Sequence, residues 1–70
     1  MSRESLIWDL IFSENIQFKI DLKKYVDDNY HYDDFVEEIK LILKKSAVQI
    51  IESKVLVNSK SALWTLKVKK

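Results

Sequence analysis

The chain has 70 residues, 47% of them hydrophobic, and a formal net charge of +1, which fits one domain with one small core and excludes two domains or a disordered chain. It contains no cysteine, glycine or proline, so disulfide frameworks, cysteine-ligated zinc sites and glycine-rich phosphate loops are excluded. Because no apolar run approaches the roughly 18 residues of a membrane span, we expect an intracellular, cytoplasmic protein without a membrane partner.

The charges are divided between the two halves of the sequence. Residues 1–38 carry four basic and ten acidic residues, a net charge of −6, whereas residues 39–70 carry eight lysines and one acid, Glu52, a net charge of +7. This asymmetry favours a polyanionic partner for the C-terminal half, with its lysines gathered on a single exposed surface. The alternative is that the lysines form only a solvated face.

The N-terminal segment has the apolar spacing of a helix. Residues 3–13 place apolar side chains at i, i+1, i+4 and i+5, and a second apolar stripe lies beside them: Leu6, Ile7, Leu10 and Ile11, then Trp8 and Phe12. Apolar groups therefore cover more of this helix than one side of a small core can bury. We expect a self-association or partner surface here, and complete burial within the monomer is the alternative.

Turns in a chain without glycine or proline are assigned to asparagine, which tolerates the left-handed conformation. Asn15, Asn29 and Asn58 each fall where the apolar periodicity changes. Between the first two, residues 16–20 alternate as in a short strand. Asp21 can then cap a short helix that ends at Asn29.

The longest periodic segment follows the connector of residues 30–32. Asp33 or Asp34 is predicted to open a helix, with Glu37 three residues after Asp34 as in a capping box. Helical spacing then continues to about residue 53, and a break near Ser46 is an alternative. Residues 55–57 and 62–68 are predicted to form a hairpin around a turn at 58–61, with Trp64, Leu66 and Val68 on one side of its second strand.

This succession of helix, short strand, short helix, long helix and hairpin resembles the winged-helix (winged helix-turn-helix) domain superfamily. The resemblance rests on residues 20–26, which look like the strand that leads into the second helix of that family, and on residues 48–68, which look like a third helix that runs into the wing. It implies an α+β fold over residues 1–70: a small winged-helix domain of three helices with a C-terminal β-hairpin wing and a short first strand.

The resemblance also implies a DNA-binding function, with the third helix and the wing against the duplex. The residues in those positions are Lys40, Lys44, Lys45, Asn58, Ser59, Lys60, Lys67, Lys69 and Lys70. Lysine neutralises phosphate but reads bases poorly, and Arg3 is the only arginine, so a weakly sequence-specific regulator is expected. The acids at the start of the long helix would repel phosphate in this mode.

The alternative function is a protein-protein interaction module or small inhibitor that does not bind DNA. Such a module would use the apolar first helix and the acidic patch of residues 27–38, either against a partner protein or in a homodimer. The candidate interface residues are Leu6, Ile7, Trp8, Ile11, Phe12, Tyr30 and Tyr32.

Catalytic and metal-binding chemistry is not indicated by the remaining polar residues. The acidic pairs at 27–28 and 33–34 lack the alternating ligands and the glycine of a calcium loop. His31 is the only histidine, and no nucleophile with an orienting partner accompanies it. We expect no enzymatic activity, no metal, no cofactor and no small-molecule substrate.

Overall fold

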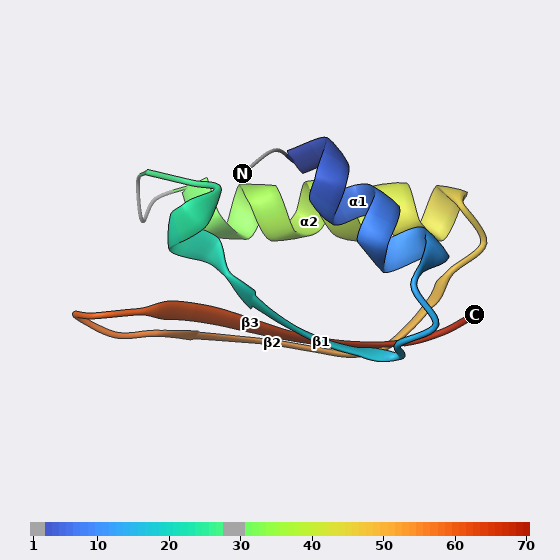
Figure 1. Cartoon of the computed structure of the whole chain (residues 1–70). Helices are drawn as coiled ribbons and strands as arrows, with labels where there is room; N and C mark the ends of the chain where they lie inside the picture. The colour runs from blue at the N-terminus through green and yellow to red at the C-terminus, as the bar shows by residue number, and fades with distance from the viewer. Residues whose placement is uncertain (1–2, 28–30) are drawn as a thin grey trace.

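The computed structural model describes residues 3–27 and 31–70. Within these ranges the chain forms two α-helices, α1 (Arg3–Phe12) and α2 (Tyr32–Lys45), one 3₁₀-helix, η1 (Leu22–Lys24), and three strands, β1 (Gln17–Asp21), β2 (Gln49–Val57) and β3 (Ala62–Lys69). The strands form one antiparallel sheet in the order β1-β3-β2. Figure 1 shows two layers, because both α-helices lie on the same side of the sheet.

The core lies between the helices and the central strand, β3. Every second residue of β3 is fully buried: Ala62, Trp64, Leu66 and Val68. Trp64 meets the Phe35 ring edge-on at a centroid distance of 6.5 Å. The indole Nε1–H of Trp64 donates to Ser53 Oγ at 2.9 Å, so the one polar group of this buried side chain is satisfied. The prediction that Trp64, Leu66 and Val68 share one side of this strand is confirmed, and that side is the buried one.

The long helix predicted to residue 53 ends at Lys45, near the break at Ser46 that was the alternative. Ala47, two residues after the end of the helix, has φ 63°, the only positive φ among the described residues. The Val48 amide then donates to Leu43 O at 2.9 Å, which closes the helix and turns the chain into β2. The helix predicted over residues 48–53 is wrong because Val48, Ile50 and Ile51 favour a strand, although their spacing also fits a helix.

The prediction of three helices with a wing is wrong, although the α+β class is compatible with the structure. The predicted second helix is the three-residue turn η1, for which Asp21 Oδ1 does accept from the Lys23 amide at 3.1 Å. The predicted third helix is α2 only as far as Lys45, and its C-terminal end is the first half of β2. The hairpin is part of the main sheet because β3 also pairs with β1.

The predicted capping box of the long helix and the predicted asparagine turns differ from the structure. Helix α2 begins at Tyr32, and its N-cap residue, His31, makes no side-chain capping bond, so the capping box from Asp34 to Glu37 does not start the helix. Neither Asn15 nor Asn58 has a positive φ, and Asn29 lies outside the described residues.

The hairpin loop at residues 58–61 is present as predicted and is held by the Asn58 side chain. Its Oδ1 accepts from the amides of Lys60 and Ser61 at 2.8 and 2.7 Å, and the Asn58 amide donates to Ser61 O at 2.8 Å. A side-chain acceptor of this kind replaces the left-handed residue that a shorter hairpin turn requires.

Candidate nucleic-acid interface

The strands turn their alternate residues away from the helices, and no described element covers this second side of the sheet (Figure 1). We call this surface the open face. Its residues follow from the strand register and the burial pattern: Gln17, Lys19 and Asp21 from β1, Leu63, Thr65, Lys67 and Lys69 from β3, and Gln49, Glu52, Lys54 and Leu56 from β2.

Cross-strand pairing brings four lysines together on the open face. Lys19 and Lys54 both pair with Thr65, one from each side. Since neighbouring strands lie about 4.8 Å apart, the backbones of these two lysines are about 10 Å apart. Lys67 and Lys69 follow Thr65 along β3, with a spacing of about 7 Å for every two residues. The fold therefore builds a basic patch, defined as Lys19, Lys54, Lys67 and Lys69, from three separate segments.

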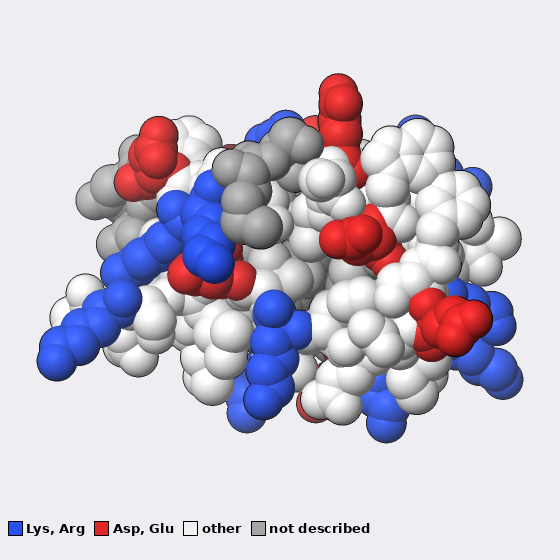
Figure 2. Space-filling view, viewed as in Figure 1, with Lys and Arg blue, Asp and Glu red and all other residues white. Residues whose placement is uncertain are grey.

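Two carboxylates, Asp21 and Glu52, share the open face with the basic patch, but neither forms an ion pair with its lysines. Within residues 3–27 and 31–70, no ion pair involves any of the four, although Glu52 is the cross-strand neighbour of Lys67. Cations of the helix layer differ, because Arg3 contacts Glu38 at 3.1 Å and Lys40 lies 3.4 Å from Glu37. Figure 2 shows several lysines projecting from the lower margin, where the open face lies, and acidic side chains mainly over the helix layer.

The predicted DNA-contacting residues do not form one surface. Lys67 and Lys69 belong to the open face, whereas Lys40, Lys44 and Lys45 lie on α2 in the opposite layer. The expectation of a single lysine surface built from the last helix and the hairpin is therefore wrong, because the residues thought to continue that helix form β2.

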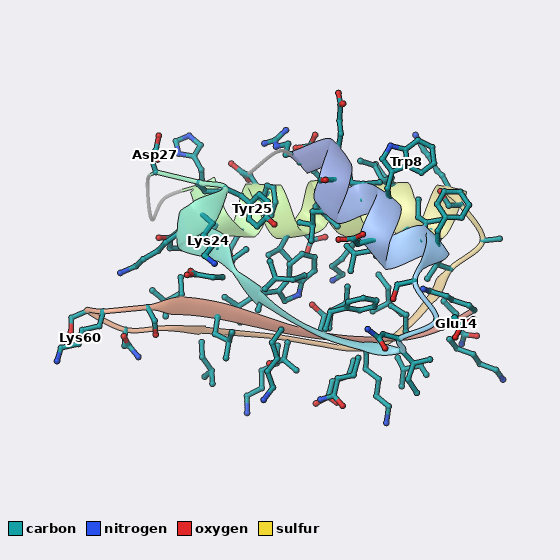
Figure 3. All side chains as sticks on the ribbon, viewed as in Figure 1. Trp8, Glu14, Lys24, Tyr25, Asp27 and Lys60 are labelled. Atoms are coloured by element: carbon teal, nitrogen blue, oxygen red, sulfur yellow. The ribbon has the colours of Figure 1, made fainter. Side chains whose placement is uncertain are left out.

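The remaining predicted contacts lie at the two ends of the sheet. Asn58, Ser59 and Lys60 form the hairpin loop, with Lys60 at its tip (Figure 3). Lys70 turns toward the start of β1, where its Nζ donates to Ser13 O and lies 5.5 Å from the centre of the Phe18 ring.

Two members of the basic patch, Lys19 and Lys54, were missing from the residues that the resemblance suggested. Lys19 alternates with the inward-facing Phe18 and Ile20, and Lys54 alternates with Ser53 and Val55. A two-residue period in both segments was the available signal, but residues 49–53 had been assigned to a helix.

Helix α1 carries a separate apolar surface, although only part of the predicted interface reaches it. Trp8 and Phe12 are 59% and 70% exposed, and their rings stack at 5.0 Å with an interplanar angle of 17°. Trp8 points away from the sheet (Figure 3). Of the other candidates, Leu6 and Tyr32 are buried in the core, Ile7 and Ile11 pack against it, and Tyr30 lies outside the described residues.

Two open grooves flank the helices. The first, about 480 Å³, lies between α1 and β1 and includes Asp9, Asp21 and Lys24. The second, about 440 Å³, lies between α2 and the start of β2 and is lined by Glu37, Lys40, Leu41, Lys44, Val48, Gln49 and Ile50. We call it the α2–β2 groove.

The part of the chain that the structure describes also bears on metal binding and on membrane insertion. No three His, Asp or Glu side chains in that part are placed to hold a metal ion. None of the described helices is long and apolar enough to cross a membrane.

Comparison of the chain with protein-family models, curated proteins and solved structures finds no match. Two exposed surfaces of the described residues, the basic patch and the Trp8–Phe12 pair, are the candidates for a functional contact.

Proposed function

We propose that the protein binds duplex nucleic acid through its open face, with the basic patch against the phosphate backbone. The observation that supports this is the convergence of four lysines from three strands on an uncovered surface, with no ion pair to any of them among the described residues. Lysines in this arrangement neutralise phosphates and release counterions, which is the main source of sequence-independent affinity.

The composition of the open face favours a duplex over a single strand. Proteins that bind single strands stack bases on aromatic side chains, and none of the open-face residues is aromatic. Lysine contacts position a protein on the backbone without specifying bases. We therefore expect weak sequence preference.

Helix α2 is a poor alternative contact. Its first two turns carry Asp33, Asp34, Glu37 and Glu38, which would repel phosphate at the end of a helix that normally enters the major groove. Its lysines lie nearer its C-terminus, beside carbonyl groups that already favour cations.

Fluorescence anisotropy with labelled duplexes of two unrelated sequences tests this proposal. The wild type should bind both duplexes with similar affinity at low salt. Four phosphate contacts predict a slope of about −3.6 in a plot of log K against log salt concentration. The triple variant Lys19→Gln, Lys67→Gln, Lys69→Gln should lose more than tenfold in affinity, and its slope should become shallower by about 2.7.

The matched control removes three lysines from the other layer. The variant Lys40→Gln, Lys44→Gln, Lys45→Gln has the same net charge as the open-face variant, so general electrostatic attraction is equal in the two. Equal losses in both variants, a larger loss in the α2 variant, or no binding of either duplex at low salt would each overturn the proposal.

A protein-binding function is the second candidate, and the exposed Trp8–Phe12 pair favours it. Stacked aromatic side chains at a surface are typical anchors of protein interfaces. A photoreactive residue introduced at position 8 should then give one discrete cross-linked product in cells that express the chain, and Phe12→Ser should abolish it. The same probe at Lys44 is the control, and equal products from both positions would contradict this function.

A further inference from the structure

Strand β2 is a long edge strand whose outer side is not paired by any described element. It spans nine residues, Gln49–Val57, and only its other side pairs, with β3. It contains no proline, and three of its apolar residues are about half exposed: Ile51 at 55%, Leu56 at 55% and Val57 at 49%. A bulge at Ile51 and the charges of Glu52 and Lys54 interrupt this edge, but its length leaves backbone groups that can pair with another strand.

We propose that β2 pairs antiparallel with β2 of a second copy of the chain, about a two-fold axis perpendicular to the sheet at Ser53. Ser53 is the middle residue of the strand, so Glu52 faces Lys54 on each side of the axis; past the bulge at Ile51, Ile50 and Gln49 face Val55 and Leu56 of the other copy. The two sheets then form one six-stranded sheet with all α-helices on the same side. The proposal does not depend on nucleic-acid binding. It would place the open faces of both copies on one continuous surface, on which Lys54 pairs with Glu52 of the second copy and Lys19, Lys67 and Lys69 remain for phosphate.

The charges of Glu52 and Lys54 favour this register over the two adjacent ones. With Ser53 at the axis, Glu52 of each copy lies directly opposite Lys54 of the other, which gives two opposite-charge pairs. Moving the axis to Glu52 places two glutamates opposite each other, and moving it to Lys54 does the same with two lysines. Opposite charges in directly facing positions stabilise a strand pair and like charges destabilise it.

The ends of the strand are also complementary in this arrangement. Val57 pairs with the buried Ala62 and therefore lies on the helix side of the sheet. Counted past the bulge at Ile51, the two-fold axis places Val57 of one copy just beyond Gln49 of the other, beside Val48 at the mouth of the α2–β2 groove. That groove exposes Leu41, which is 53% accessible. Each copy thus supplies an apolar end and a groove, as a self-complementary two-fold interface requires.

Sedimentation and light scattering of the full chain test the dimer. The wild type should have twice the 8.3 kDa monomer mass. Lys54→Glu should dissociate it, because two glutamates would then face each other twice. Within its own chain position 54 pairs with Thr65, so the variant should keep its circular dichroism spectrum. Lys19→Glu makes the same charge change on the far edge strand and should remain dimeric.

Restoration by charge exchange separates the proposed pairing from a general effect of charge. The double variant Glu52→Lys, Lys54→Glu reverses both pairs and should recover the dimer mass. A monomeric wild type, dissociation by Lys19→Glu as much as by Lys54→Glu, or a folded double variant that stays monomeric would overturn the proposal.

Disulfide trapping tests the register itself. The chain has no cysteine, so thiols placed at Glu52→Cys and Lys54→Cys in separate preparations are unique. On mixing and mild oxidation, the 52–54 heterodisulfide should dominate, because directly opposite Cβ atoms lie about 5 Å apart and residues two positions away lie farther. Predominant 52–52 or 54–54 products would show another register. A monomer that still binds duplex DNA would overturn the dimer and leave the proposed function intact.

Discussion

The two faces of the sheet are made by alternate residues of the same strands, yet they carry opposite kinds of side chain. On β3 the helix-facing residues are apolar and fully buried, whereas the open-face residues include Thr65 and two lysines. Because successive residues of a strand point to opposite sides, the residues of one face form the core and those of the other face form the exposed surface. The comparison predicts that neighbouring residues on β3 differ sharply in what their substitution changes.

The largest effect is expected at Trp64. Trp64→Ala removes a fully buried ring that contacts Phe35 and leaves Ser53 without its donor. The free energy of unfolding should fall by about 3–5 kcal/mol, which is most of the stability expected of a small domain. Urea titration followed by circular dichroism measures the change.

The neighbouring residue is the matched control. Thr65→Ala alters the open face, where the Thr65 hydroxyl forms no hydrogen bond with another described residue, and should change the free energy of unfolding by less than about 0.5 kcal/mol. Similar losses for Trp64→Ala and Thr65→Ala would remove the distinction between the two faces.

The hairpin loop sharpens the comparison because it joins the two long strands that carry both faces. Asn58→Ala removes the acceptor of the Lys60 and Ser61 amides. The free energy of unfolding should fall by about 1–2 kcal/mol, since each such bond contributes about 1 kcal/mol. The thermal midpoint by calorimetry measures it, with Ser59→Ala in the same exposed loop as control. A loss in Ser59→Ala that equals the loss in Asn58→Ala would show that the side-chain acceptor is not what holds the loop.

The fold was predictable in segments whose apolar spacing fits either a helix or a strand, but not both. The alternation around Phe18 and Ile20 located β1, and the turn residues near Asn58 located the hairpin loop. The inward face of β3 also followed from its sequence alone.

The secondary structure of residues 46–53 was predicted wrongly because their apolar spacing fits a helix as well as a strand. The β2–β3 register slips between Ile50 and Glu52, and this irregularity interrupts the two-residue period that would have marked β2. The candidate site depended on that segment. Lys54 lies near Lys19 because β1 and β2 pair with opposite sides of β3. This arrangement joins segments that are far apart in the sequence, so local periodicity could not predict it.

Ala47 lies between α2 and β2, where the chain passes from the helix layer to the sheet. Apart from the controls, its substitution is expected to have the smallest effect on stability. Its φ of 63° lies in the left-handed region, which costs an L-residue about 1–2 kcal/mol and costs glycine nothing. Ala47→Gly should raise the free energy of unfolding by about 0.5–1 kcal/mol, the remainder being offset by the greater freedom of glycine in the unfolded chain. Ala62→Gly makes the same chemical change at a buried position of β3 without a positive φ, and it should destabilise. If both variants destabilise in urea titrations, Ala47 does not carry the strain that its backbone angle indicates, and the helix must end for another reason.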